Sequence, residues 1–339
     1  MTKILIVAPS WVGDAVLAQP LFKRLHERLP GVILDVLAPL WVAPLLSRMP
    51  EVNEVITSPF RHGELNLRDR RRLGRKLAAR RYDQAIVLPN SWKSALIPFF
   101  ARIPVRTGFV GEMRFVLLND GRTLNKLQFP LMVERFALLG EERGTSLKRP
   151  LATPGLRLSA SGREAVLKKL GLDARKPVVA FCPGAEYGPA KRWPPNYFAE
   201  LARGLHGKGY QIWLFGSPND ASVCGEIQRL SSGDVDNLCG KTTLDEAIDL
   251  LSCASLVVSN DSGLMHIAAA LDKPLYALYG SSSPSFTPPL SAKAKILKLD
   301  LPCMPCFQRV CPLKHFNCMM QLTPEKVLAK IDFKKVEPS

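Results

Sequence analysis

The chain has no long hydrophobic run. A membrane-spanning helix needs about 20 consecutive apolar residues, whereas the longest apolar stretches here, such as residues 95–101, are short and interrupted by proline. The start of the chain also lacks the long apolar segment and the small-residue cleavage site of a secretory signal peptide. We therefore expect a cytoplasmic protein without a membrane-spanning helix.

The two commonest nucleotide-binding fingerprints are missing as well. Residues 8–14, which follow the first predicted strand, contain no G-x-G-x-x-G, and this disfavours a nicotinamide or flavin dinucleotide site. The segment 184–192 is not a Walker motif, because Lys191 follows Gly188 by three positions and no Ser or Thr comes next. A P-loop ATPase is therefore disfavoured too.

Acidic residues are few. The chain has 30 Asp and Glu against 46 Lys and Arg, for a formal net charge of +16. This excess implies an anionic partner, which could be nucleic acid, an acidic membrane surface or a phosphorylated substrate. Part of it is concentrated in one predicted helical segment, which contains Arg61, Arg68, Arg70, Arg71, Arg72, Arg75, Lys76, Arg80 and Arg81. We expect this segment to face anionic lipid and phosphates, with a merely solvated helix as the alternative.

The eight cysteines argue against a disulfide framework in an intracellular chain. Four lie in apolar contexts and are predicted to be small core residues: Cys182, Cys224, Cys239 and Cys253. The other four form a group with His315 inside it, and they are Cys303, Cys306, Cys311 and Cys318. This group contains enough soft ligands for one tetrahedral metal. Its spacing matches no common zinc module, so we favour packed, reduced thiols and keep a structural zinc as the alternative.

Short apolar runs alternate with amphipathic ones along the chain, as is typical of parallel, doubly wound α/β sheets. With 339 residues, the chain is long for one hydrophobic core and is expected to form two domains. A boundary is predicted within residues 150–171, where prolines and serines precede a helical stretch and a new strand. The prediction is a Rossmann-like domain at 1–165, a second at 172–320, and a final helix at 321–339 that is able to pack back on the first domain.

Two loops in the second half follow predicted buried strands and carry polar groups. The loop at 183–192 has glycines and a basic pair, and the loop at 259–263 has a carboxylate, a hydroxyl and a glycine before a helical run. Open α/β sheets bind ligands at the carboxyl ends of their strands, and a helix N-terminus attracts anions. The two loops therefore suit a substrate with phosphate and sugar hydroxyls, which indicates a nucleotide-sugar enzyme.

Each polar residue also has an ordinary structural alternative. An isolated Lys191–Arg192 pair would be merely solvated, and His266 is more often a buried, satisfied histidine than a catalyst. Thr242 is suited either to the nucleoside part of a donor or to capping the next helix. Asp14, just after the first strand and next to Gly13, is equally suited to a ligand site or an N-cap.

Three segments together, residues 11–15, 184–193 and 259–266, resemble glycosyltransferase family 9, the bacterial heptosyltransferase family. The resemblance covers nearly the whole chain. It implies the GT-B fold, in which two Rossmann-like domains face each other across a cleft, the first binding the acceptor and the second the ADP-sugar. The implied activity is inverting transfer of L-glycero-D-manno-heptose from ADP-heptose onto the first heptose of the lipopolysaccharide inner core. The alternatives are another family 9 sugar transferase, such as heptosyltransferase I, or a non-catalytic nucleic-acid-binding protein.

The resemblance also implies roles for individual residues. Asp14 is the expected general base, and Lys191 is expected to stabilise the departing ADP. The expected donor-binding residues are Gly184, Glu186, Arg192, Thr242, Asp261, Ser262, Gly263, Leu264 and His266. Glu186 departs from the family pattern, because some relatives have a hydroxyl there. The expected acceptor-binding residues are Gly13, Arg61 and Arg71.

The resemblance further implies the partners of the chain. They are ADP-heptose as a substrate, an anionic inner-core acceptor, and the cytoplasmic face of the inner membrane, contacted peripherally. No nucleic acid, no cofactor and no protein-bound metal is expected. In particular, Asp234 and Asp236 form a D-x-D pattern that in other transferases binds a metal, but here we predict that they lie in a turn.

Overall fold

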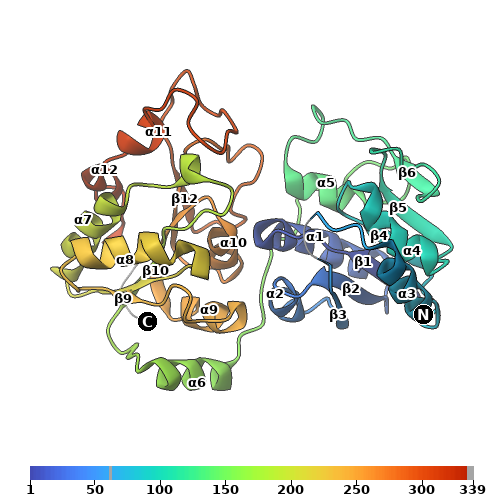
Figure 1. Cartoon of the computed structure of the whole chain (residues 1–339), viewed down its shortest axis with the longest axis horizontal. Helices are drawn as coiled ribbons and strands as arrows, with labels where there is room; N and C mark the ends of the chain where they lie inside the picture. Colours follow the sequence, from blue (N-terminus) through green and yellow to red (C-terminus); the bar gives the residue numbers. More distant parts are fainter. Residues whose placement is uncertain (61–62, 334–339) are drawn as a thin grey trace. The chain divides into compact units, whose positions relative to one another are not determined.

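The computed structural model describes residues 1–60 and 63–333 of the chain. It divides into two compact units, Met1–Arg157 and Leu158–Ser339. Each unit contains a six-stranded parallel sheet with helices around it (Figure 1). The change of unit after Arg157 lies within the segment 150–171.

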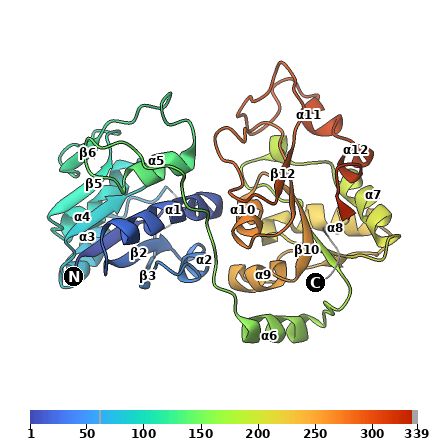
Figure 2. The same ribbon diagram turned by 180° about the vertical axis from the view of Figure 1, so that it is seen from behind.

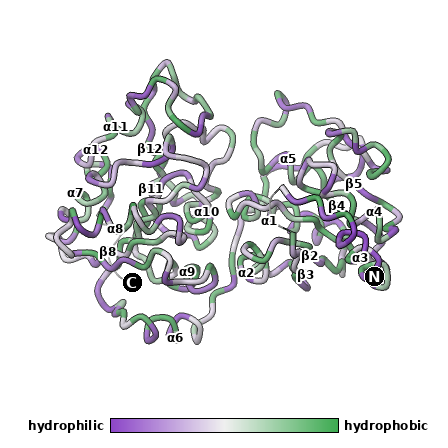
Figure 3. The backbone as a smooth tube through the Cα atoms, viewed as in Figure 1, coloured by the Kyte–Doolittle hydropathy of each residue, from purple (hydrophilic) through white to green (hydrophobic). Residues whose placement is uncertain are grey.

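The sheet of the first unit has the strand order β3-β2-β1-β4-β5-β6. Its strands are β1 (Lys3–Val7), β2 (Ile33–Pro39), β3 (Glu54–Ser58), β4 (Gln84–Val87), β5 (Val105–Phe109) and β6 (Asp120–Arg122). All neighbouring strands are parallel, and in the central pair, β1 and β4, Ile4 lies opposite Gln84. The central strands are hydrophobic, as their green colour shows in Figure 3, because parallel strands are buried on both faces.

Helices cover both faces of this sheet (Figures 1 and 2). They are α1 (Val12–Arg28), α2 (Ala43–Ser47), α3 (Leu67–Ala78), α4 (Leu96–Phe100) and α5 (Met132–Leu138). The helix α1 contacts α2 and α5, whereas α3 contacts α4. The chain moves from β1 toward one edge of the sheet and later from β4 toward the other edge, so right-handed crossovers put α1 and α2 on one face and α3 and α4 on the other. The helix α5 follows the last strand, β6, and packs on α1.

The second unit repeats the architecture with the strand order β12-β11-β10-β7-β8-β9. Its strands are β7 (Val178–Cys182), β8 (Gln211–Leu214), β9 (Asp236–Asn237), β10 (Ala254–Asn260), β11 (Leu275–Leu278) and β12 (Ala294–Leu297). Its helices are α6 (Ala160–Leu170), α7 (Pro195–His206), α8 (Ala221–Leu230), α9 (Leu244–Leu251), α10 (Gly263–Ala270), α11 (Asn317–Met320) and α12 (Pro324–Leu328). Both units are therefore doubly wound α/β sheets, as the sequence pattern predicts.

The end of the chain contributes to the core of the second unit. The helix α12 contacts α7, and Val327 and Ile331 belong to the same apolar cluster as Trp193. Trp193 is fully buried, and its indole Nε1 donates to the carbonyl of Leu322 over 2.6 Å. Burying one large apolar side chain contributes about 1.5–3 kcal/mol. The described part of the segment 321–339 is thus held in the second unit.

The structure corrects one expectation about the cysteines. Cys224 and Cys239 were expected to be separate core thiols, but they form a disulfide. Both are buried, as predicted; Cys224 lies on α8, which contacts β9, and Cys239 lies just after β9, so the fold brings them together. The pairing was missed because it depends on how α8 packs, which the local sequence does not show.

Among the described residues, no helix has the length and apolarity needed to cross a membrane.

Candidate functional site

Each sheet has one place where the chain reverses the direction in which it adds strands. In the first unit this switch point lies between β1 and β4, and in the second it lies between β7 and β10. Loops that leave the carboxyl ends of two such strands diverge, which leaves room for a ligand. The two polar loops of the second half follow β7 and β10, so the fold brings them together at the second switch point.

An ion pair joins these two loops. The Nζ of Lys191 lies 2.6 Å from Oδ2 of Asp261, and the side chains are 16% and 4% exposed. Lys191 ends a short 3-10 turn, Pro189–Lys191, and Asp261 follows β10. A hydrogen bond between two charged groups is short and strong, so the ammonium is held at a fixed position at the strand ends.

Ser282 is part of the same cluster and was not predicted from the sequence. Its hydroxyl donates to Oδ2 of Asp261, the oxygen that Lys191 also contacts. Ser282 is buried and follows β11, the neighbour of β10. The signal in the sequence was a run of small and polar residues, 280–283, after an apolar strand. Ser282 therefore orients the carboxylate from the third strand end in the row.

The N-terminus of α10 lies directly after Asp261. Ser262 is the residue before the helix, Gly263 and Leu264 are its first two residues, and all three are partly exposed. The first backbone N–H groups of a helix have no partner within it, and the helix dipole makes this end positive. These three residues thus offer N–H groups suited to an anion, next to the fixed cation of Lys191.

His266 lies one turn into α10 and is 4% exposed. Burial is the main reason that its pKa falls to about 4, with a smaller opposing effect from Asp261. The imidazole is therefore neutral at physiological pH, and within the described part of the chain its buried Nδ1 has no hydrogen-bond partner. This agrees with a buried histidine, but not with a fully satisfied one.

Gly184 leaves room for a second buried carboxylate. A Cβ built on Gly184 would overlap the carboxyl group of Asp220, so any side chain there would displace Asp220. Asp220 is 6% exposed and accepts from the backbone N–H and the hydroxyl of Ser217. Its Oδ1 is buried and has no partner among the residues described. Asp220 was not predicted from the sequence, because it lies after β8, in a loop without an evident motif.

The remaining predicted donor residues surround this edge of the sheet. Arg192 donates weakly to the carbonyl of Ala185 at 3.3 Å, and Glu186 is exposed. The helix α9 is capped by Thr243, whose hydroxyl accepts from the N–H of Glu246 at 3.2 Å. Thr242 is therefore not the capping residue, and its contact with a donor stays a prediction.

The segment that contains the second cysteine group packs on the Lys191 loop. The carbonyl of Arg309 accepts from the N–H of Ala190 at 3.0 Å, and that of Phe307 accepts from the hydroxyl of Tyr187 at 2.6 Å. A Cβ on Gly188 would overlap the Arg309 carbonyl oxygen, so the close approach requires glycine. This segment helps to fix the loop.

Three of the thiols in this cysteine group are partly exposed, and Cys318 is buried. Within residues 1–60 and 63–333, no group of three or more His, Cys, Asp or Glu side chains is arranged to hold a metal ion. Of the D-x-D residues, Asp236 begins β9 instead of lying in a turn, Asp234 lies in the loop before it, and both are exposed.

In the first unit, Asp14 is the third residue of α1 and is partly buried at the carboxyl end of β1. The residue before the helix is Trp11, so Asp14 is not the N-cap, although a carboxylate in the first turn is still favoured by the helix dipole. Gly13 precedes it in the same turn. Both lie at the switch point of the first sheet, just after β1, as the sequence predicts.

The arginines of the first unit do not all have the expected role. Arg70 is 6% exposed, its guanidinium donates to the carbonyl of Leu65 at 2.6 Å and to that of Glu64 at 3.0 Å, and it stacks over the ring of Phe60 at 4.1 Å. It therefore stabilises the start of α3, and the expectation that it faces lipid was wrong. Arg71 is exposed, and Arg61 lies outside the described residues.

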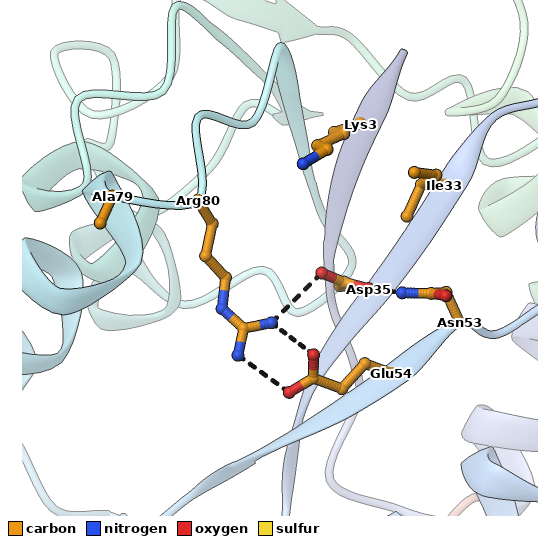
Figure 4. A pocket seen from close by; sticks show the side chains of 7 residues that line it. All are labelled: Lys3, Ile33, Asp35, Asn53, Glu54, Ala79 and Arg80. Atoms are coloured by element: carbon orange, nitrogen blue, oxygen red, sulfur yellow. Dashed lines mark hydrogen bonds and ion pairs between the residues drawn. The ribbon is translucent and has the colours of Figure 1, made fainter. Parts of the chain in front are cut away.

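Arg80 also has partners within the protein. It forms two hydrogen bonds with Glu54, at 2.6 and 2.9 Å, and a longer contact of 3.4 Å with Asp35 (Figure 4). Asp35 also accepts from the hydroxyl of Tyr82 and from the amide of Asn53. Arg80, Glu54, Asp35 and Asn53 line a pocket at the amino ends of the strands. The network links the end of α3 to the sheet.

Two doubly wound sheets with polar loops at their switch points are typical of an α/β enzyme that binds its ligands at the strand ends. The chain belongs to glycosyltransferase family 9 (heptosyltransferase), whose model matches residues 70–317. It is 48% identical to lipopolysaccharide heptosyltransferase 2 of Salmonella typhimurium and 47% identical to that of Escherichia coli, in both cases with 97% of each chain covered. It is also similar to the solved structure of E. coli ADP-heptose lps heptosyltransferase II, with a TM-score of 0.88, 45% identity and coverage of 99% and 98%. The resemblance, the fold class and the enzyme class expected from the sequence are thus confirmed.

Proposed function

We propose that this glycosyltransferase transfers L-glycero-D-manno-heptose from ADP-heptose onto the first heptose of the lipopolysaccharide inner core. The observation that carries the proposal is the 47–48% identity to two lipopolysaccharide heptosyltransferases 2 over 97% of each chain. A lipopolysaccharide heptosyltransferase 1, from Pseudomonas aeruginosa, is 25% identical to the chain. This difference favours the second heptose transfer over the first.

The second unit would bind the donor. In this proposal the ammonium of Lys191 and the N–H groups of Ser262, Gly263 and Leu264 contact the diphosphate, because both are suited to anions. Asp261 accepts hydrogen bonds from sugar hydroxyls while Lys191 and Ser282 hold its carboxylate in place. The further donor contacts proposed from the sequence are Gly184, Glu186, Arg192, Thr242 and His266.

The proposed reaction is a single displacement with inversion at the anomeric carbon. The carboxylate of Asp14 takes the proton from the acceptor hydroxyl, and that oxygen forms a bond to the anomeric carbon. The bond between this carbon and the donor phosphate oxygen breaks, and ADP leaves with the electron pair. Lys191 and the N-terminus of α10 stabilise the added negative charge. No protein-bound metal and no cofactor takes part in this proposal.

The acceptor would be an anionic lipid that carries carboxylates and phosphates. We propose that Gly13, Arg61 and Arg71 contact it, and that the protein is attached peripherally to the cytoplasmic face of the inner membrane. The net charge of +16 supports an anionic partner. Nucleic acid is not a partner in this proposal, since the family accounts for the charge through phosphorylated substrates.

Incubation with ADP-heptose and a panel of truncated lipopolysaccharides tests the proposal. The acceptor with a single core heptose should gain one heptose by mass spectrometry, and the acceptor without heptose should remain unchanged. Transfer only to the heptose-free acceptor would instead indicate the first heptose transfer. Failure of both, together with tight binding of an oligonucleotide at physiological salt, would favour the nucleic-acid alternative.

A further inference from the structure

A groove rich in arginine lies on the first unit, beside α3 and α4. Its volume is about 680 Å³. The lining residues from α3 are Arg71 and Arg75, those from α4 are Phe99 and Phe100, and the others that matter here are Arg102, just before β5, and Arg106, near the start of β5. Among the described residues that line it, none is acidic. The groove therefore combines four cations with aromatic surface.

Gly74 allows the close contact between α3 and α4 that forms this groove. A Cβ on Gly74 would lie 2.5 Å from Cβ of Phe100 and 2.9 Å from the carbonyl oxygen of Ile97, so only glycine allows α3 to lie this close to α4. Arg71 and Arg75 are four residues apart and lie on the same side of α3. The close helix contact thus brings both guanidiniums to the segment that contains Arg102.

Three cations of the groove, Arg71, Arg75 and Arg102, differ from two other arginines of α3. Arg70 donates to backbone carbonyls, and Arg72 pairs with Asp69 at 2.7 Å. Within the part of the chain that the structure describes, no carboxylate pairs with Arg71, Arg75 or Arg102. Like charges at this spacing repel each other. A partner that carries negative charge would remove this repulsion.

Two phenylalanine rings of α4 stand beside these cations. Phe99 is 36% exposed, Phe100 is half-buried, and the guanidinium of Arg106 lies 5.6 Å from the centre of the Phe99 ring. Two bonds to backbone carbonyls, those of Leu117 and Ile103, hold Arg106 in place. Exposed apolar groups next to unpaired arginines fit the boundary between lipid phosphates and acyl chains.

The groove lies away from the predicted chemistry of its own unit. The segment with Arg102 and Arg106 enters β5 at its amino end, whereas Gly13 and Asp14 follow β1 at its carboxyl end. In a parallel sheet these ends lie on opposite edges. A ligand in the groove would leave Gly13 and Asp14 free for the acceptor; of the proposed acceptor contacts that the structure describes, only Arg71 lines the groove.

We propose that this groove binds the phosphate headgroups of anionic phospholipids and is the surface with which the first unit contacts the membrane. Guanidinium groups bind phosphate oxygens in pairs, and Phe99 enters the region below the headgroups. The assignment rests on the proposed peripheral membrane contact but does not depend on which sugar is transferred.

Vesicle sedimentation at low ionic strength tests the groove. The test variant is Arg75→Gln with Arg102→Gln, which leaves Arg71 intact because Arg71 is a proposed acceptor contact. The matched control is Arg68→Gln with Arg72→Gln, which removes the same charge from exposed positions of α3 that do not line the groove. Vesicles of phosphatidylglycerol mixed with phosphatidylcholine should bind the test variant on the order of tenfold to thirtyfold more weakly than wild type. The control variant should lose much less, and pure phosphatidylcholine should bind none of them.

Further binding measurements separate a lipid surface from a free anion and from a nucleic acid. Equal vesicle binding by wild type and the test variant, or equal losses by the two variants, would overturn the proposal. A loss of inorganic phosphate binding with unchanged vesicle binding would overturn it in favour of a free anion, and a loss of oligonucleotide binding alone would do so in favour of nucleic acid. Phe99→Ala should weaken vesicle binding even at high salt, since its contribution is not electrostatic.

Transfer to a delipidated, water-soluble acceptor separates this proposal from the proposed function. Arg75 and Arg102 have no place in the proposed reaction, so the test variant should turn over this acceptor like wild type. Failure of wild type itself would count against the proposed function and leave the vesicle result valid. Unchanged thermal unfolding of the test variant shows that it is folded, and both positions are exposed.

Discussion

The two units hold their proposed ligand-binding cations in different ways. In the second, the ammonium of Lys191 lies 2.6 Å from a carboxylate that is 4% exposed and is itself fixed by a serine. In the first, Arg75 and Arg102 are exposed and line a groove without an acidic residue among its described lining. A fixed ammonium suits one diphosphate in one orientation, whereas exposed guanidiniums suit a surface of mobile phosphates. The position of a partner carboxylate thus distinguishes the proposed donor site from the proposed docking surface.

The largest effect is expected from the carboxylate at the switch point of the first sheet. Asp14→Asn should reduce turnover on the order of 10²–10⁴-fold, which is the usual contribution of a general base. ADP affinity should not change, because the proposed donor site lies in the second unit. Single-turnover kinetics and calorimetry with ADP measure the two quantities. Normal turnover with reduced stability would mean that Asp14 only stabilises the start of α1.

The ion pair of the second unit is the next test. Lys191→Ala should weaken ADP binding by about tenfold to a hundredfold, because a hydrogen bond to a charged group contributes about 1.5–3 kcal/mol. It should also lower the free energy of unfolding by about 3 kcal/mol, since it leaves Asp261 buried without its cation.

Asp261→Asn serves as the control for this variant. Combined with Lys191→Ala, it should restore part of the stability but none of the ADP affinity, and a double-mutant cycle separates the two effects. If calorimetry gave the same ADP affinity for Lys191→Ala and wild type, Lys191 would not be part of the donor site. The comparison between the cations of the two units would then no longer hold.

His266 gives the second unit a dependence of stability on pH. Its folded-state pKa of about 4 lies below the ordinary value of 6.5, so below pH 6.5 the unfolded chain binds a proton that the folded chain does not. The free energy of unfolding therefore has its full value above pH 6.5 and decreases as the pH falls toward 4. At pH 5 the decrease due to His266 is about 2 kcal/mol.

Urea unfolding of wild type and His266→Gln at pH 7.5 and pH 5 measures this term. The loss of stability between these two pH values should be about 2 kcal/mol smaller in the variant. Equal losses would mean that the imidazole becomes protonated in the folded protein.

The strand and loop pattern of the sequence was sufficient for part of this architecture. Apolar runs followed by polar loops predicted both sheets and the positions of Lys191 and Asp261, because these signals are local. Ser282 and Asp220 could not be assigned in this way. Their roles depend on β11 lying next to β10 and β8 next to β7, and strand order is decided by packing between segments far apart in the chain.

The arginines of α3 show a different limit. Arg70 belongs to the same helical face as Leu73 and Leu77, so the 3.6-residue period marks it as directed toward the core, but its charge suggested the opposite. The backbone carbonyls that accept its protons become acceptors only when the preceding loop folds around it. Charge alone therefore assigned the proposed docking role to more arginines of this helix than the structure supports.

The smallest expected effect tests whether the arginines of α3 really divide into structural and exposed ones. Arg70→Gln removes a guanidinium that donates to the carbonyls of Leu65 and Glu64 and stacks on Phe60, and it should lower the free energy of unfolding by about 1 kcal/mol. The cost stays near this value because Glu64 and Leu65 are exposed residues, so their carbonyls regain water when the guanidinium is removed. Arg72→Gln removes the same charge from a side chain that is 82% exposed, and it should change stability by less than about 0.5 kcal/mol. Chemical denaturation of both variants measures the difference. Equal stabilities would mean that Arg70 contributes no more to stability than an exposed arginine, and the proposed docking surface would then extend across the whole helix.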